Sequence, residues 1–482
     1  MKDKFYLTTS IPYVNAAPHI GHALEYVQAD VLARFHRKEE ETFFLTGADE
    51  NALKNVQAAE AAGVPTADFV RKNTGEFERL VKALYISNND FIKTTDRVRH
   101  WPGTQKLWQK CAENHDIYKG VYKGLYCVGC ESYLTEDELK DGLCPEHKKK
   151  PEAVEEENYF FNLKRYQPAL EKLIVTGELE IIPIERKNEV LNFIRRGLSD
   201  FSVSRSRARA KDWGIPVPND LDQIQYVWFD ALANYITALG YGQAEEKNFD
   251  RFWPADIHII GKGITRFHAI YWPAMLLSAK LPLPKKIFVH GYVTVNGEKI
   301  SKSTGNTVDP FTLIEKFGAE ALRYYLLKVI PPTADGDFSE KHFTEVYNAD
   351  LANGLGNLVA RVAKMCEGLL LSRATSNRSL QLCETVGEEI KNFRFNTALA
   401  IIWQHISVLD KLINEERPWE KTAEEKTKIL IQIIIGNNSL VPILEIAEAL
   451  EPFLPETSQK IIGQFSGESV HADKALFPRI KI

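Results

Sequence analysis

Residues 5–28 read FYLTTSIPYVNAAPHIGHALEYVQ, and this stretch decides the fold. The first five residues are apolar or β-branched, which predicts a buried strand of a parallel sheet over 5–9. A loop follows, and Pro18 then suits the first turn of a helix that we expect to continue to residue 37. A strand that leads through a short loop into a helix N-terminus is a ready-made binding site for an anion.

The start of this helix carries His19 and His22. Their spacing places both imidazoles on one helix face, beside the backbone N–H groups and the positive end of the helix macrodipole. Gly21, between them, has no side chain that would block a ring from stacking there. Because two neighbouring histidines are also common as structural or solvated residues, a phosphate site needs a second signal.

The second signal is the sequence GEKISKSTGN at residues 297–306. Its lysines Lys299 and Lys302, its hydroxyl groups, among them Ser301, and its flanking glycines predict a cationic loop suited to a polyphosphate. A solvated turn is the alternative interpretation. Together, HIGH in the first strand–helix unit and KISKS in this loop resemble the two signatures of class I aminoacyl-tRNA synthetases.

Length and composition bound the class of protein. A chain of 482 residues is too long for one hydrophobic core and predicts about three domains. The formal net charge of −5 provides no global attraction to nucleic acid, so RNA would have to bind local basic patches. The longest apolar run, residues 429–435, is far shorter than the ~20 residues of a membrane helix. The N-terminus lacks the apolar core of a signal peptide. We expect a cytoplasmic protein that contacts no membrane.

Strand and helix patterns alternate after the first helix. Residues 42–46 predict the next strand, and Asp49 follows its end. Helical patterns come next, over 51–62, 66–84 and 101–114. This alternation is typical of an α/β fold with a Rossmann-like, doubly wound parallel sheet. Ligands of such sheets bind beyond the carboxyl ends of the strands, where Asp49 and the HIGH stretch are expected.

A cysteine-rich segment interrupts this alternation. Of six cysteines, three cluster with a histidine, which fits a reducing compartment and a metal better than a disulfide framework. A CxxC pair followed by CxxH offers three thiolates and one imidazole, a closed tetrahedral set with no open position for a substrate. We therefore predict one structural Zn²⁺ that stabilises a small module with little core of its own. Its ligands would be Cys127, Cys130, Cys144 and His147.

The segment 148–219 mixes acidic, aromatic and basic residues. Its basic stretch is either a solvated face or a track for a nucleic-acid backbone, and the sequence supports both interpretations equally. That stretch contains Arg205, Arg207, Arg209 and Lys211. Strand-like residues at 226–230 and 257–262 then resume the sheet pattern, so the segment is expected to be an insertion between two halves of one domain.

With these elements in place, the chain resembles the methionyl-tRNA synthetase family, of the bacterial type with a single zinc knuckle, over nearly its whole length. The insertion spans about a hundred residues, whereas the leucine, isoleucine and valine families carry a much larger one for editing. A set of aromatic rings with aliphatic side chains between them suits the flexible thioether of methionine. The resemblance implies that methionine binds to Ile11, Asp49, Trp228, Ala231, Leu232, Tyr235, Ile264, His268 and Trp272.

The chain is helical past about residue 348, where Leu351, Leu355 and Leu358 keep a 3.6-residue period. The resemblance implies that this region reads the anticodon through Asn357, Arg361 and Trp419, because an Asn/Arg pair can bond base edges and an exposed Trp can stack on a base. Taken singly, these residues also fit ordinary helix-surface and packing roles, as the aromatic residues of the methionine site fit an ordinary core.

The resemblance also implies a division of the chain into regions. We expect a Rossmann catalytic domain at 1–115 and 220–290, an inserted connective domain with the zinc knuckle at 116–219, a KISKS loop and stem-contact region at 291–345, and a helical anticodon-binding domain at 346–482.

The implied reaction has two steps. The carboxylate of methionine attacks the α-phosphate of ATP to give methionyl-adenylate and pyrophosphate, and the terminal ribose hydroxyl of tRNA(Met) then attacks the activated carbonyl. Asp49 would anchor the α-ammonium group of methionine, and Mg²⁺ would accompany ATP without a dedicated protein cage. The implied catalytic residues are His19, His22, Lys299 and Lys302. The implied ATP-binding residues are Tyr13, His19, Gly21, His22, Gly261, Lys299, Ser301 and Lys302.

The chain departs from the family pattern in two places. The family usually shows TDEHG where this chain has ADENA, so that Asn51 and Ala52 replace His and Gly. It commonly shows GKDI where this chain has GKGI, so that Gly263 replaces a carboxylate beside the nucleotide. The frequent C-terminal tRNA-binding extension, which also dimerises the family, is missing, and we expect a monomer. Two rival functions stay open: another class I synthetase, and a catalytically weakened paralogue that binds RNA.

Overall fold

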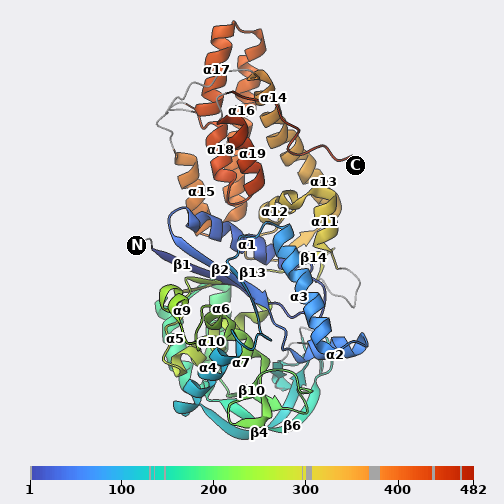
Figure 1. Ribbon diagram of the computed structural model, residues 1–482, viewed down its shortest axis with the longest axis vertical. Coiled ribbons are helices and arrows are strands. Elements are labelled where there is room, and N and C mark those ends of the chain that lie inside the picture. Colours follow the sequence, from blue (N-terminus) through green and yellow to red (C-terminus); the bar gives the residue numbers. More distant parts are fainter. Residues whose placement is uncertain are drawn as a thin grey trace. The chain divides into compact units, whose positions relative to one another are not determined.

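A computed structural model of the protein (Figure 1) describes residues 3–129, 132–134, 136–145, 148–295, 297–299, 307–367, 380–436, 440–466 and 469–481. The chain forms two compact units. The first comprises Met1–Pro18, Glu39–Leu80 and Ser87–His290, and the second comprises His19–Lys38, Val81–Ile86 and Gly291–Ile482. The helix that begins with the HIGH motif is therefore grouped with the C-terminal half of the chain.

The first unit is built on a six-stranded parallel sheet with the order β3-β2-β1-β12-β13-β7. β1 pairs with β2 on one side and, across a long insertion, with β12 on the other, so that Leu7 lies opposite Ile257. Its last four residues are buried, as the apolar, β-branched sequence predicts. The strands are β1 (Lys4–Thr9), β2 (Glu41–Ala48), β3 (Asp90–Lys93), β7 (Glu180–Ile182), β12 (Ile257–Gly261) and β13 (Lys286–His290).

Helices connect these strands, and the predicted helices 51–62, 66–84 and 101–114 are present within one or two residues at each end. A single-turn π-helix, η4 (Phe267–Tyr271), runs directly into α10. The helices of this part of the chain are α2 (Leu53–Ala61), α3 (Thr66–Ala83), α4 (Trp101–Glu113), α5 (Gln167–Thr176), α6 (Ile184–Arg195), α7 (Val227–Leu232), α8 (Asn234–Thr237), α9 (Lys247–Phe252) and α10 (Trp272–Ser278), with the 3₁₀ turns η1 (Glu136–Glu138), η2 (Leu163–Tyr166) and η3 (Lys262–Ile264).

The inserted segment contains two small sheets with the orders β5-β4-β6-β8 and β10-β11-β9. Their strands are β4 (Ile117–Cys127), β5 (Ser132–Leu134), β6 (Glu152–Phe161), β8 (Phe201–Ser202), β9 (Ser204–Ser206), β10 (Pro216–Val217) and β11 (Asp220–Gln225). β7, although it lies inside the range predicted for the insertion, is the edge strand of the main sheet, where Ile181 pairs with Ile287. A strand of three residues is too short for its period to be read from sequence.

The expectation of a strand over 226–230 is wrong. These residues begin α7, and the amides of Phe229 and Asp230 both donate to the Tyr226 carbonyl oxygen, at 2.9 and 3.1 Å. The run YVWFD is apolar up to its last residue, and such a run does not reveal its period. The helical signal is the i, i+3, i+4, i+7 spacing of the residues expected to bind methionine: Trp228, Ala231, Leu232 and Tyr235.

The second unit combines the HIGH helix with the C-terminal helices (Figure 1). The helical prediction from about residue 348 onward is confirmed, and a ten-residue π-helix precedes α14. The helices are α1 (Ile20–Arg37), α11 (Pro310–Phe317), α12 (Ala319–Lys328), α13 (Glu340–Val346), η6 (Tyr347–Gly356), α14 (Asn357–Met365), α15 (Gln381–Lys391), α16 (Phe395–Glu416), η7 (Pro418–Glu420), α17 (Ala423–Ile435), α18 (Ile443–Leu450) and α19 (Pro455–Phe465). A small sheet contains β14 (Val293–Val295), β15 (Glu298–Lys299) and β16 (Gly336–Phe338).

The predicted fold class, an α/β protein with a parallel sheet and a helical C-terminal part, is confirmed. The finer division into four regions stays a prediction. Across the described ranges, no helix combines the length and apolar character that crossing a membrane requires.

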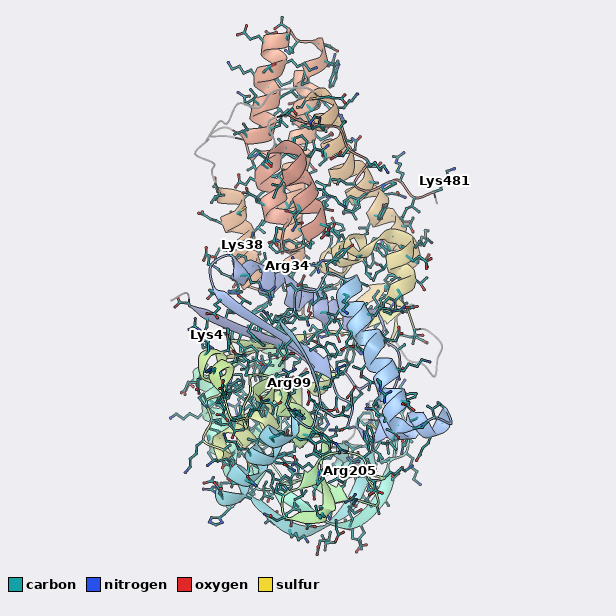
Figure 2. All side chains as sticks on the ribbon, viewed as in Figure 1. Lys4, Arg34, Lys38, Arg99, Arg205 and Lys481 are labelled. Atoms are coloured by element: carbon teal, nitrogen blue, oxygen red, sulfur yellow. The ribbon has the colours of Figure 1, made fainter. Side chains whose placement is uncertain are left out.

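A fully buried arginine joins four segments of the second unit. Arg323, in α12, is 0% exposed, and its guanidinium group lies 2.7 Å from the Asp30 carboxylate in α1. The same guanidinium group donates to the carbonyl oxygens of Leu84, Pro452 and Phe453 at 2.8–3.0 Å. Asp30 also accepts a hydrogen bond from Arg34, which is labelled in Figure 2, at 2.8 Å. Arg323 therefore ties α1 to the C-terminal helices of this unit.

The Arg323→Met variant should lose about 3–5 kcal/mol of stability, because the substitution leaves three buried carbonyl groups and a buried carboxylate short of donors. Urea unfolding followed by circular dichroism measures this loss. Arg34→Met is the matched control, since it removes a more exposed arginine from the same carboxylate while Arg323 remains. We expect a clearly smaller loss there, and equal losses in the two variants would contradict the assignment.

Candidate functional site

The first turn of α1 is capped by its own two histidines. The Gly21 amide donates to His19 Nδ1 and the His19 amide donates to His22 Nδ1, both at 3.1 Å. The two rings stack with their centroids 3.9 Å apart. A Cβ atom on Gly21 would approach the His19 ring to 3.0 Å, which explains the glycine. Because each Nδ1 accepts an N–H, each neutral ring carries its proton on Nε2 and presents a donor there.

This helix start contacts the chain just after the KISKS motif. The Ile20 amide donates to the carbonyl oxygen of Val308 at 3.2 Å. Before the motif, β14 and β15 form a hairpin, and the backbone of Lys299 lies in β15. Ser301, Lys302 and the side chain of Lys299 lie outside the described residues. The second unit therefore brings the HIGH motif close to the segment that follows KISKS.

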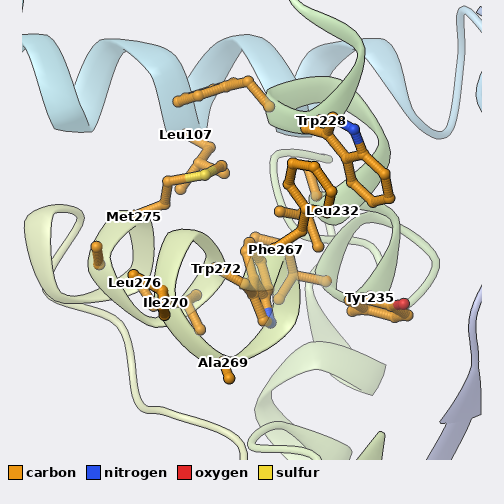
Figure 3. Close-up of a cluster of buried hydrophobic side chains, with 14 of the residues drawn as sticks. Leu107, Trp228, Leu232, Tyr235, Phe267, Ala269, Ile270, Trp272, Met275 and Leu276 are labelled. Atoms are coloured by element: carbon orange, nitrogen blue, oxygen red, sulfur yellow. The ribbon is translucent and has the colours of Figure 1, made fainter. Parts of the chain in front are cut away.

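In the first unit, the residues predicted to bind the methionine side chain gather in one hydrophobic cluster. Trp228 and Leu232 come from α7, Tyr235 from α8 and Trp272 from the start of α10, and each is at most 6% exposed. Figure 3 shows these side chains together with Phe267, whose ring is stacked on Trp228 with centroids 3.7 Å apart. Ile11 and Ile264 are half-buried and pack against this cluster, and the buried His268 ring lies edge-on to Trp228. Ala231 is buried in α7, directly before Leu232.

His268 is held as a single tautomer. Its Nδ1 lies 3.0 Å from the carbonyl oxygen of Ile264, which only accepts, so the proton must be on Nδ1. The other ring nitrogen, Nε2, then accepts the hydroxyl of Tyr235 at 2.7 Å. The predicted residues His268 and Tyr235 thus fix each other's orientation.

A second buried imidazole, His258 in β12, was not among the predicted site residues. Trp272 Nε1 donates to its Nε2 at 3.3 Å, so its Nδ1 carries the proton and donates to Thr8 Oγ1 at 2.7 Å. Its ring stacks on Tyr235 with centroids 4.2 Å apart. Burial, and to a lesser extent the nearby His268, hold the pKa of His258 well below its ordinary value. A single polar residue in the apolar run IHIIG is the sequence signal that would have found it.

Asp49 and Tyr13 lie together at the end of β2. They form a parallel bridge, in which the Asp49 amide donates to the Pro12 carbonyl oxygen at 2.9 Å. Asp49 is 2% exposed, and its Oδ1 accepts the amide of Asn51 at 3.1 Å. The Lys54 ammonium group lies 3.6 Å from the centre of the Tyr13 ring. Tyr13 also meets Trp228 edge-on at 6.1 Å, so the predicted carboxylate and the aromatic cluster share one neighbourhood.

Two glycines that the sequence analysis names lie at the end of β12 and just after it. Gly261 is the last residue of that strand, and Gly263, where the family commonly has a carboxylate, is exposed in the next turn. Among the predicted zinc ligands, Cys127 and Cys144 are 4% and 1% exposed and share a small buried cluster with Leu134. Cys130 and His147 lie outside the described residues, and within the described ranges no group of three or more potential metal ligands is found.

Comparisons with known proteins decide the family. A model described as tRNA synthetases class I (M) matches residues 5–150 and 137–363. The methionine–tRNA ligase of Thermotoga maritima is 42% identical over 96% of this chain and 76% of its own length. That of Brucella suis is 39% identical over 99% of this chain and 94% of its own length. The chain belongs to the methionyl-tRNA synthetase family.

A solved structure agrees with this assignment. The Mycobacterium tuberculosis methionyl-tRNA synthetase in complex with methionyl-adenylate matches with a TM-score of 0.91 and 37% sequence identity, over 99% of this chain and 100% of that chain. The predicted family, the fold class and the expected class of activity, an ATP-dependent aminoacyl-tRNA ligase, are thereby confirmed.

The residues that the sequence predicts to read the anticodon lie on helices of the second unit. Asn357 opens α14 and is exposed. Arg361, one turn later, reaches α16, where its guanidinium group donates to Asp410 at 2.5 Å and to Asn414 at 2.7 Å. Trp419 is 53% exposed, so its indole is accessible for stacking. The partners of Arg361 were not predicted, because they are far away in the sequence.

The basic stretch 205–211 matches neither open interpretation as a whole. Arg205 is 4% exposed, donates to the hydroxyl of Tyr126 at 2.9 Å and lies over its ring, among the strands of the insertion (Figure 2). Arg207, Arg209 and Lys211 form surface ion pairs with neighbouring carboxylates. The stretch therefore combines one buried arginine with a paired, solvated face.

The stability of the first unit should fall at acid pH because of His258. Its folded-state pKa is lowered from an unfolded value of ~6.5. Below that pH the imidazole of His258 binds a proton in the unfolded chain but not in the folded chain. The free energy of unfolding therefore falls by up to about 1.4 kcal/mol for each unit by which the pH is lowered. Urea unfolding across this range measures the slope. The His258→Gln variant keeps a donor and an acceptor without titrating and should lose this contribution. An unchanged slope in the variant would contradict the assignment.

Proposed function

We propose that this chain is a methionine–tRNA ligase that forms methionyl-adenylate and pyrophosphate from methionine and ATP, and then transfers methionine to the 3′ end of tRNA(Met). The observation that carries the proposal is the aromatic cluster of the first unit. Residues from separate parts of the chain meet there around two buried, hydrogen-bonded imidazoles, His258 and His268. Such a cluster is largely apolar, which suits a thioether and disfavours charged side chains.

The aromatic cluster binds the side chain of methionine. The sulfur atom gains contacts with the rings of Trp228, Tyr235 and Trp272, each worth ~0.3–1.5 kcal/mol. Asp49 binds the α-ammonium group by a charge-assisted hydrogen bond. The Asn51 amide on Oδ1 supports this role, because it orients the carboxylate before the substrate arrives.

The two histidines of α1 act as hydrogen-bond donors to the phosphate groups of ATP. The helix cap keeps the proton of each neutral ring on Nε2, so no proton has to move as charge develops on the α-phosphate. The carboxylate oxygen of methionine then displaces pyrophosphate from phosphorus in line, and the side chains of Lys299 and Lys302 balance the charge on the leaving group. Gly21 keeps the rings accessible, and Tyr13, Gly261 and Ser301 contact the nucleotide.

The cysteine-rich module holds one structural zinc ion through Cys127, Cys130, Cys144 and His147. The buried cluster that Cys127 and Cys144 share supports this set, because two thiol side chains from separate segments already lie together. When bound, zinc supplies a cross-link for the fold and takes no part in the chemistry. Mg²⁺ binds with ATP and reduces the charge of its phosphates.

The exposed Asn357, the paired Arg361 and the exposed Trp419 read the anticodon of tRNA(Met). The carboxylate of Asp410 holds the Arg361 guanidinium in one orientation, which supports recognition of a base edge, and the accessible Trp419 indole supports stacking. We further propose that the chain works as a monomer in the cytoplasm, where its thiol-based metal site stays reduced.

Pyrophosphate exchange into ATP tests the proposal. With each standard amino acid in turn and no tRNA, we expect exchange with methionine alone. Exchange with another amino acid would keep the class I reaction but reject the methionine-binding role of the aromatic cluster. The absence of exchange with all amino acids would favour the RNA-binding paralogue, for which the departures at Asn51, Ala52 and Gly263 are the motivation.

The same assay tests the histidine roles. His22→Ala should lower the exchange rate by about a hundredfold or more, the usual effect of removing one donor to a developing oxyanion. His36→Ala, at the other end of α1, is the control and should keep the rate of the parent.

Metal analysis tests the zinc site. We expect about one zinc per chain, and Cys144→Ser should bind clearly less, because a three-ligand site holds zinc more weakly. Cys383→Ser, which changes a half-buried thiol in α15, should leave the content at one. Hydrogen exchange of the chelated protein should accelerate in the insertion while the main sheet stays protected. A fully folded, metal-free parent would contradict the site.

A further inference from the structure

We propose that Asn51 is a positioning residue for methionine: its side-chain amide ties the carboxylate of Asp230 on α7 to the strand end that carries Asp49. The inference rests on the proposed function, since it concerns the geometry with which Asp49 and α7 hold the two ends of methionine. Asn51 stands where the family usually has a histidine, and this chain uses its amide as a bridge.

Asn51 contacts both sides through different groups. Its backbone amide donates to Asp49 Oδ1 at 3.1 Å. Its side-chain Nδ2 donates to Asp230 Oδ2 at 2.7 Å and to the carbonyl oxygen of Thr94 at 2.9 Å. The residue is 7% exposed, so bulk water does not replace a bond that is lost here.

Asp230 requires this bridge because it is a buried carboxylate. It is 1% exposed, and each of its oxygens has a strong donor nearby. Oδ2 accepts from Asn51, and Oδ1 lies 2.7 Å from Nε2 of the fully buried His100. His100 Nδ1 in turn lies 2.7 Å from Thr237 Oγ1 in α8. Removing one donor leaves half of a buried carboxylate unsatisfied, which is strongly unfavourable.

The position of Asp230 in the chain links this network to the substrate. It lies in the six-residue helix α7, directly before Ala231 and Leu232 and two residues after Trp228. If α7 rotates to bring the Asp230 carboxylate to another donor, the side chains of Trp228, Ala231 and Leu232 move with it, because the helix is so short. His100 connects Asp230 to the start of α4, whereas Asn51 connects it to the end of β2, beside Asp49. Asn51 therefore sets the spacing between the ammonium anchor and the face of α7 that contacts the thioether.

The Asn51→Asp variant tests the bridge. It keeps the size of the side chain but places a carboxylate where an amide now donates to Asp230, so the two groups repel. In pyrophosphate exchange with the full chain, we expect the KM for methionine to rise about tenfold or more, with a much smaller change in the KM for ATP. Adding Asp230→Asn in the same chain restores a donor–acceptor pair and should recover a large part of the loss.

Asn114→Asp is the matched control. Asn114 also donates to a buried aspartate of the first unit, Asp116, at 2.7 Å, but contacts none of the residues assigned to methionine. We expect it to lower stability without raising the KM for methionine. Asn51→Ala, which introduces no charge, is the second variant if Asn51→Asp does not fold, and it should also raise the KM for methionine selectively.

The outcomes separate the inference from the function on which it rests. Suppose that the parent enzyme exchanges with methionine. The inference alone would then be overturned if the Asn51 variants left the KM for methionine unchanged, or if they raised the KM for methionine and the KM for ATP equally. So would a rise of the same size in Asn114→Asp, or no recovery in the double variant. A parent without exchange would overturn the proposed function as well.

Discussion

The parallel pairing of β1 with β12 is the constraint on which the first unit depends. β1 precedes the insertion in the sequence and β12 follows it, yet the two strands lie side by side near the middle of the sheet. Their carboxyl ends therefore point the same way, and so does that of β2. Ile11 and Tyr13 follow β1, Asp49 follows β2, and the segment with Ile264 and His268 follows β12. One register thus assembles a site from residues that are distant in the sequence, as expected at the strand ends of an open α/β sheet.

Hydrogen bonds also fix which ring nitrogen acts as donor in the two buried imidazoles of the first unit. His258 and His268 are each bonded at both ring nitrogens, and their partners leave one tautomer for each ring. Asp230, by contrast, is a buried acidic side chain on which Asn51 and His100 converge from two sides. The hydrogen bonds of the two imidazoles and of Asp230 leave few polar atoms of this region without a partner.

The sequence predicts the parts whose patterns are local. β1, the start of α1 and the residues around it could be placed because an apolar strand, a proline at a helix start and paired histidines are short-range signals. The strand expected at 226–230 was wrong because an apolar run fits a buried strand and a buried helix equally well. β7 was missed because it has three residues, and Asp410 because its partner Arg361 lies on another helix. The bridge from Asn51 to Asp230 likewise requires contacts that only the tertiary fold creates.

The double use of the His19 and His22 rings explains why an imidazole is needed at both positions. Nδ1 of each ring accepts a backbone amide at the start of the helix, and Nε2 stays a donor. An asparagine amide reproduces only the position of Nδ1 and a glutamine amide only that of Nε2, so neither side chain can satisfy both requirements. Any molecule that accepts a hydrogen bond from Nε2 of these rings also stabilises the tautomer that caps the helix. Ligand binding and the integrity of the first helical turn are therefore thermodynamically linked through two aromatic rings.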